Sequence, residues 1–216
     1  MAFTEIEYFA TQSTFQYYPT MPVELNREAE GNLRYIRQAM ERAEQVSAGS
    51  GLGGIGMGGV AIAGSIYAAS VWQSEDDLRQ QLLIWLVTAV FAITIGLIAA
   101  YFKSRSLERM LLNDPARRFA LCLAPNLLAG AVLTGVLWNT PQHTLVPAIW
   151  LLSYGCGVLS AGTYAVRPVM LMGGCFVVAG VLAFVLTPAW LNVYLGTVFG
   201  GLHIIFGWWV FRRYGG

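Results

Sequence analysis

Six long apolar blocks, separated by short polar segments, constrain this chain more than any other feature of its sequence. They lie at about 52–72, 82–102, 119–139, 146–165, 168–187 and 192–211. Each has close to the roughly 20 residues that a helix needs to cross about 30 Å of hydrocarbon. Only 12% of the residues are charged, against about 25% in an ordinary soluble domain. The pattern predicts an all-α integral membrane protein with six transmembrane helices.

The last three blocks follow one another with very short connections, which predicts antiparallel neighbours. Pro168 and Pro188 mark these connections, and proline suits the first turn of a helix better than its interior. We therefore expect residues 48–216 to form an up-down bundle.

The basic residues predict how this bundle is oriented. Twelve of the 13 Lys and Arg residues precede the first block, follow the sixth, or lie in the second-to-third and fourth-to-fifth connections. Only Arg79 lies on the other side. Because basic residues favour the cytoplasmic side, both termini are predicted to be cytoplasmic, in a membrane that we expect to be the bacterial cytoplasmic membrane.

Residues 1–22 contain six aromatic residues and no sustained periodicity, so they are predicted to form an extended arm. Tyr17 and Tyr18 lie near its end. An arm this rich in aromatic side chains is expected to pack against this protein or a partner.

Residues 23–47 are predicted to form a cytoplasmic amphipathic helix, because apolar residues including Leu33, Ile36 and Met40 recur at steps of three and four. The helix is not rich in Lys and Arg, as a helix lying on anionic lipid would be. Two interpretations stay open: packing on the basic loop 103–118, or association with a partner or a second copy. Ser47–Gly51 is expected to break this helix before the membrane.

Small residues recur at steps of three and four along the first, fourth and sixth blocks, a spacing that lets helix backbones approach closely in membranes. The glycines of these stripes are Gly54 and Gly58 in the first block, Gly157 in the fourth, and Gly196, Gly200 and Gly207 in the sixth. We expect these three helices to form a tight inner cluster, and the chain to form a homo- or hetero-oligomer. The first block also matches a glycine-rich dinucleotide motif, but no strand or βαβ unit surrounds it.

His203 is the only His, Lys, Arg, Asp or Glu well inside a predicted span, which makes it a candidate functional residue. Three interpretations compete. The first is a structural hydrogen bond to Asn126, Ser153 or Thr163, and the second is contact with a solute in a polar pocket. The third is axial ligation of a tetrapyrrole, for which Gly200 and Gly207 would leave room.

Pro125 and Asn126 form a second candidate, because a proline inside a span frees a carbonyl that a cavity or a neighbouring helix can use. A carrier or channel for a neutral or weakly polar solute would be lined by these residues together with Tyr154 and His203.

The composition excludes several function classes. No predicted span contains Asp, Glu, Lys or Arg, which disfavours ion-coupled transport. No catalytic or metal-binding motif occurs, and a net charge of +1 does not suggest nucleic-acid binding. The sequence favours a non-enzymatic scaffold, accessory subunit or membrane-bound regulator that acts through its cytoplasmic segment. The first alternative is the small carrier or channel, and the second, which the sequence favours less, is a tetrapyrrole- or quinone-binding subunit.

Overall fold

A computed structural model describes residues 23–72, 74, 78–104 and 114–214 of the chain. Side chains are described at 27–38, 51–72, 74, 79–102 and 116–214. The arm 1–22 with Tyr17 and Tyr18, the middle of the loop 103–118 and the side chain of Met40 lie outside the described residues.

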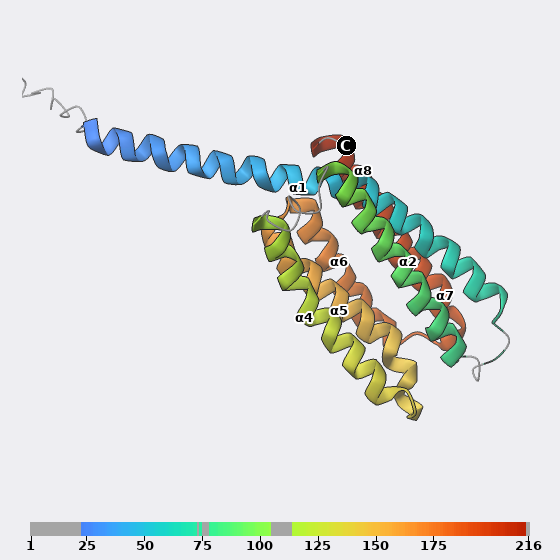
Figure 1. Ribbon diagram of the computed structural model, residues 1–216. Helices are drawn as coiled ribbons and strands as arrows, with labels where there is room; N and C mark the ends of the chain where they lie inside the picture. The colour runs from blue at the N-terminus through green and yellow to red at the C-terminus, as the bar shows by residue number, and fades with distance from the viewer. Residues whose placement is uncertain (1–22, 73, 75–77, 105–113, 215–216) are drawn as a thin grey trace, which may run out of the picture. The chain divides into compact units, whose positions relative to one another are not determined.

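Helices and short turns make up the described part of the chain, which contains no strand (Figure 1). The long helices are α1 (Val23–Ser70), α2 (Leu78–Ser104), α4 (Asp114–Leu137), α5 (Val146–Ala161) and α6 (Arg167–Ala183). The 3₁₀ turns η2 (Pro141–Leu145) and η3 (Gly162–Tyr164) flank α5, while α7 (Pro188–Leu195), the π-helical turn η4 (Gly196–Gly201) and α8 (Leu202–Tyr214) follow one another directly.

The chain divides into two compact units, Met1–Met40 and Glu41–Gly216. The expected break at Ser47–Gly51 is wrong, because α1 is helical through these residues. Glycine costs about 1 kcal/mol relative to alanine inside a helix, a penalty that the flanking helical segments outweigh here.

Five helical segments are long and apolar enough to cross a membrane, which indicates an integral membrane protein. They are Gly51–Ser70, Arg79–Phe102, Ala116–Leu137, Pro141–Tyr164 and Pro188–Tyr214. The remaining predicted span, 168–187, is shorter than expected: α6 ends at Ala183 after 17 residues. Thr187 is extended (φ −74°, ψ 149°), as a residue before proline prefers to be, so the chain leaves the helix before Pro188.

The helices of the second unit form two groups (Figure 1). In one group, α5 lies between α4 and α6, and Leu151 and Phe176 are fully buried there. A Cβ atom at Gly155 would lie 2.7 Å from the backbone nitrogen of Val177, so α5 and α6 are in backbone contact.

The other group consists of α1, α2 and the segment α7–η4–α8. Here α1 packs closely on η4 and α8, because a Cβ at Gly58 would lie 2.7 Å from the Gly200 carbonyl oxygen and 2.6 Å from the side chain of Ile204. A Cβ at Gly54 would lie 3.3 Å from the Cα of Gly207. The small-residue stripes of the first and last spans therefore meet, as the sequence predicts.

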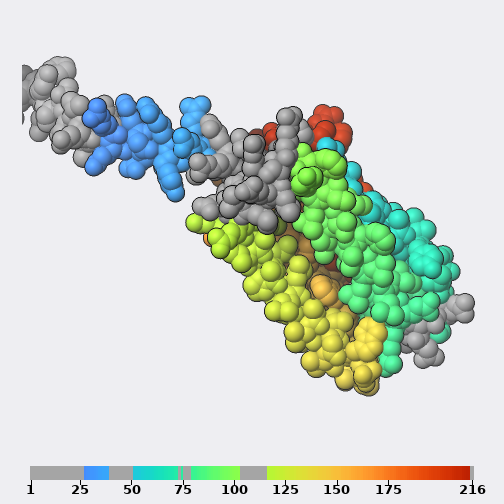
Figure 2. Space-filling model, viewed as in Figure 1, coloured from blue at the N-terminus to red at the C-terminus, as the bar shows by residue number. Residues whose placement is uncertain are grey.

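The predicted inner cluster is incomplete, however, since the small-residue stripe of α5 faces a different partner. A Cβ at Gly157 would lie 2.8 Å from Leu123 and 3.2 Å from the Cβ of Asn126, both on α4. Ser153 likewise lies against Gly130 of α4. The side chain of Tyr154, rather than these small residues, connects α5 to α8. Figure 2 shows α2 and α4 exposed on the same face of the molecule.

Candidate functional site

His203 lies in the first turn of α8 with both ring nitrogens engaged. Nδ1 lies 2.7 Å from the Phe199 carbonyl oxygen, which can only accept, so Nδ1 carries the proton. Nε2 lies 2.7 Å from the hydroxyl of Tyr154 on α5. In a neutral imidazole, Nε2 accepts the hydrogen bond that this hydroxyl donates. This neutral form, with a hydrogen bond at each ring nitrogen, suits a side chain that is 5% exposed within an apolar span.

The geometry agrees with a structural hydrogen bond to a neighbouring helix but not with the partners expected from the sequence. Asn126, Ser153 and Thr163 use their polar groups elsewhere or on other faces. Asn126 Nδ2 donates to the Cys122 carbonyl of its own helix at 2.9 Å, and Thr163 Oγ1 donates to the Ser160 carbonyl at 2.8 Å.

Four rings form an aromatic cluster around this hydrogen bond: Tyr154, Phe176, Phe199 and His203. Phe176 of α6 is fully buried, with its centroid 4.9 Å from that of Tyr154 and 5.0 Å from that of Phe199. These centroid distances lie in the favourable range for aromatic pairs. The aromatic cluster thus connects the two helix groups.

The space expected beside His203 for a flat tetrapyrrole is filled by α1. A Cβ at Gly200 would lie 2.5 Å from Ile62, and one at Gly207 would lie 2.8 Å from the Gly51 carbonyl oxygen. The nitrogen that would ligate a metal, Nε2, already binds Tyr154. The residues present therefore do not fit a tetrapyrrole at this position.

Pro125 does not interrupt α4, which is helical from Asp114 to Leu137. The Asn126 amide binds its own helix, and its Cβ lies beside Gly157. Of the two uses expected for this region, a cavity or a neighbouring helix, the described contacts of Asn126 agree with a packed helix interface.

A second polar site, which the sequence analysis missed, surrounds Asn192 of α7. We call Ser65, Gln81, Trp85 and Asn192 the polar cluster. Trp85 Nε1 donates to Asn192 Oδ1 at 2.9 Å, and Asn192 Nδ2 donates to Gln81 Oε1 at 3.0 Å. Ser65 Oγ donates to the Asn192 backbone carbonyl at 2.8 Å. Three helices, α1, α2 and α7, are joined through this one asparagine.

The direction of these bonds leaves one buried donor without an acceptor. Indole Nε1 can only donate, so the atom of Asn192 facing Trp85 is its oxygen, and its amide nitrogen faces Gln81. Gln81 must then accept with Oε1, which directs its own Nε2 away. Gln81 is 2% exposed, and Nε2 has no hydrogen-bond partner among the described residues. Buried polar atoms are rarely left in this state.

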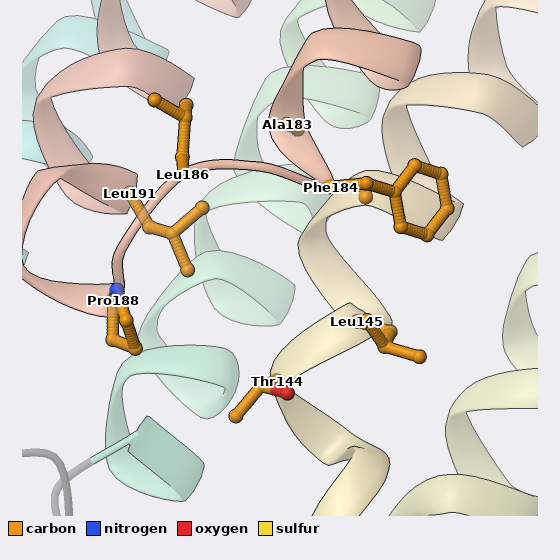
Figure 3. Close-up of a pocket in the computed structure, with 8 residues that line it drawn as sticks. Thr144, Leu145, Ala183, Phe184, Leu186, Pro188 and Leu191 are labelled. Atoms are coloured by element: carbon orange, nitrogen blue, oxygen red, sulfur yellow. The ribbon is translucent and has the colours of Figure 1, made fainter.

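Neither of two cavities in the described part of the chain is lined by a residue predicted to form a site. One, of about 230 Å³, lies between the start of α5 and the α6–α7 connection, with Thr144, Ala183, Pro188 and Leu191 among its lining residues (Figure 3). The other is an open apolar groove of about 630 Å³ between α1 and α2. No group of three His, Cys, Asp or Glu that could hold a metal ion occurs among the described residues.

The described part of the first unit is a helix whose side chains at 27–38 are all exposed. Leu33 and Ile36, two of the predicted interface residues, are 65% and 53% exposed, and Tyr35 is 73% exposed. The exposed surface of this helix therefore combines large apolar and charged side chains.

Comparisons of the chain with known protein families, with curated proteins and with solved structures give no match.

Proposed function

We propose that this chain is a non-enzymatic, multi-pass membrane protein that works as a scaffold, accessory subunit or membrane-bound regulator. Its cytoplasmic N-terminal segment binds another protein chain. The observation that carries the proposal is the exposure of Leu33 and Ile36, which lie three residues apart and thus on the same side of α1.

The arrangement of the membrane unit supports a structural role for its interior. The side-chain hydrogen bonds at Asn192 and His203 join helices of this chain to one another. Such bonds hold membrane helices together, because no water is available there to satisfy polar groups. This favours a rigid bundle that carries a binding segment over a bundle built around a transport path.

We further propose that α6 is a sixth span. Its 17 residues extend about 25 Å at 1.5 Å per residue, which is close to the hydrocarbon thickness. Contacts with the neighbouring span run along it, from Gly162 beside Met170 at one end to Leu152 beside Gly180 towards the other. Six spans agree with the distribution of basic residues and with two cytoplasmic termini.

The binding proposal is tested by replacing the exposed apolar residues with Gln, which is compatible with a helix. Full-length wild type and the double variant Leu33→Gln/Ile36→Gln are purified from their native membrane in mild detergent. Quantitative mass spectrometry identifies co-purifying chains, and light scattering gives the mass of the complex. We expect wild type to retain a stoichiometric partner chain or second copy, and the double variant to lose it.

The matched control is Glu30→Ala/Arg34→Ala, which alters two exposed charged residues of the same helix. It is expected to retain the partner, because substitution of exposed charged residues away from the apolar side chains has little effect. A wild-type protein that purifies as a lone monomer contradicts the proposal, as does equal retention in all three proteins.

A further inference from the structure

Five exposed arginines lie at one end of the helices of the second unit, and we call them the arginine surface. They are Arg117 and Arg118 near the start of α4, Arg167 at the start of α6, and Arg212 and Arg213 in the last turn of α8. The sequence from Ala116 to Tyr214 contains no Asp or Glu. This part of the chain therefore offers the five guanidinium groups no carboxylate as a partner.

The start of α4 is held beside the start of α6. The guanidinium carbon of Arg118 lies 5.8 Å from the centroid of the Tyr164 ring, and Tyr164 precedes Arg167 by three residues. Arg117, Arg118 and Arg167 therefore lie at the same boundary of the two apolar spans that begin at Ala116 and end at Tyr164.

The end of α8 lies at this level as well, because the last span runs antiparallel to α6. Ala183 near the end of α6 lines a cavity together with Leu191, and Phe176 one half of the helix earlier contacts His203, with 5.4 Å between the ring centroids. The start of α6 and the end of α8 therefore come to the same end of the bundle, which in Figure 1 is the end that carries the C-terminus.

Two of the guanidinium groups are positioned by aromatic rings. Besides Arg118 on Tyr164, the guanidinium carbon of Arg212 lies 5.1 Å from the centroid of the Trp208 ring. Such a contact uses the face of the ring as a partner for the cation, and the N–H groups of the guanidinium can still donate. Tyrosine and tryptophan favour the headgroup level of a membrane, which is the level of the lipid phosphates.

The chemistry of the arginine surface favours an anionic headgroup over a zwitterionic one. A planar guanidinium can bind a phosphate through two parallel hydrogen bonds. A zwitterionic headgroup also carries an ammonium group, for which Ala116–Tyr214 supplies no carboxylate. Within 41–216, the segments that adjoin this end in the sequence hold nine basic and four acidic residues, whereas 73–81 at the other end holds one basic and three acidic residues. The long-range field at this end therefore attracts anions.

We propose that the arginine surface binds phospholipids whose headgroup carries a phosphate and no ammonium, in preference to zwitterionic lipids. The proposal requires the apolar spans to lie in a bilayer, but it is independent of a partner at the N-terminal segment. Loss of that partner with retention of the lipid preference would therefore overturn the proposed function alone.

The test is native mass spectrometry of the full-length protein in mild detergent, titrated with phosphatidylglycerol or with phosphatidylcholine of the same acyl chains. We expect wild type to bind phosphatidylglycerol at least about tenfold more tightly, because each basic residue beside an anionic headgroup contributes about fivefold. The triple variant Arg117→Gln/Arg118→Gln/Arg167→Gln is expected to lose most of this preference and to bind phosphatidylcholine as wild type does.

Two single variants form the matched pair. Arg118→Gln is expected to weaken phosphatidylglycerol binding about fivefold, whereas Arg79→Gln, at the opposite end of the spans, is expected to leave it unchanged. Arg212→Gln/Arg213→Gln tests the surface from α8 and keeps the experiment decisive if the triple variant misfolds. Excess glycerol phosphate, a soluble headgroup, is expected not to displace the lipid, because the acyl chains contribute to its binding.

Equal affinities of wild type for the two lipids would overturn the proposal, as would an unchanged preference in both the triple variant and Arg212→Gln/Arg213→Gln. Equal effects of Arg118→Gln and Arg79→Gln would show that net charge, rather than this surface, attracts the lipid. Displacement by glycerol phosphate would assign the surface to a soluble phosphate compound. Loss of a co-purifying chain from the arginine variants, with lipid preference unchanged, would assign it to a protein.

Discussion

At the scale of single residues, Asn192 makes the hydrogen bonds that join α7 to α1 and α2. Its amide binds Trp85 and Gln81 of α2, and its carbonyl binds Ser65 of α1. Asn126 is a natural comparison, because its amide nitrogen binds only the Cys122 carbonyl one turn back in the same helix.

Replacement of Asn192 by Leu is therefore expected to lower the free energy of unfolding by about 1–3 kcal/mol. This range assumes that each of the two lost side-chain bonds contributes about 0.6 to 1.7 kcal/mol, as interhelical hydrogen bonds in membranes do. Asn126→Leu is expected to lower it less, because only a hydrogen bond within its own helix is lost. Unfolding by sodium dodecyl sulfate in lipid bicelles measures both, and equal losses in the two variants would contradict this role for Asn192.

Single-residue reasoning found His203 from sequence because an ionisable side chain is rare inside a span. It missed the polar cluster for a physical reason. Gln81 and Trp85 are ordinary residues for the end of a span, and Asn192 lies 111 residues from Gln81. Only the packing of α7 against α2 brings them together, and no local pattern encodes that packing.

At the scale of helices, glycines allow the backbones of neighbouring elements to approach closely. The stripes in the first and last spans predicted the contact of α1 with α8, because close backbone approach requires small residues on both sides. The prediction that α5 packs through its stripe on the first and last spans is wrong. Its Gly157 faces Leu123 and Asn126 of α4, since a stripe shows that a helix packs closely but not on which neighbour.

Two adjacent glycines of α1 provide the test of this packing. A Cβ at Gly58 would lie 2.6 Å from Ile204 and 2.7 Å from the Gly200 carbonyl oxygen, whereas a Cβ at Gly59 meets nothing within 4 Å. Gly58→Ala is expected to destabilise the bundle by about 1–3 kcal/mol, the usual cost of overpacking. Gly59→Ala is expected to be neutral or slightly stabilising, because alanine is the better helix former.

Unfolding by sodium dodecyl sulfate in lipid bicelles also measures the stabilities of the Gly58→Ala and Gly59→Ala variants. Similar stabilities for Gly58→Ala and Gly59→Ala would show that α1 and α8 are not in backbone contact at this level.

At the scale of the whole molecule, hydropathy predicted an all-helical membrane protein and the positions of five apolar helices. Hydropathy overestimated the length of α6. Apolar residues continue beyond the helix through Phe184–Leu186, while the backbone turns towards Pro188. The division into two helix groups was not predictable. The aromatic cluster of Tyr154, Phe176, Phe199 and His203, which connects the two groups, was not predictable either, because its members lie on three different helical segments.

The number of membrane crossings is the central claim for the whole molecule, and it can be determined from the sides on which the two termini lie. With six spans the two ends of the chain lie on the same side, whereas with five they lie on opposite sides. Cys122, Cys156 and Cys175 form no disulfide and can be replaced by Ala to give a cysteine-free background.

The most direct measurement is labelling of single cysteines, placed at Ala2 or at Gly216, by a membrane-impermeant maleimide in sealed vesicles of known orientation. We expect both positions to be labelled in inside-out vesicles and neither to be labelled in right-side-out vesicles. Labelling of the two positions from opposite sides would contradict it.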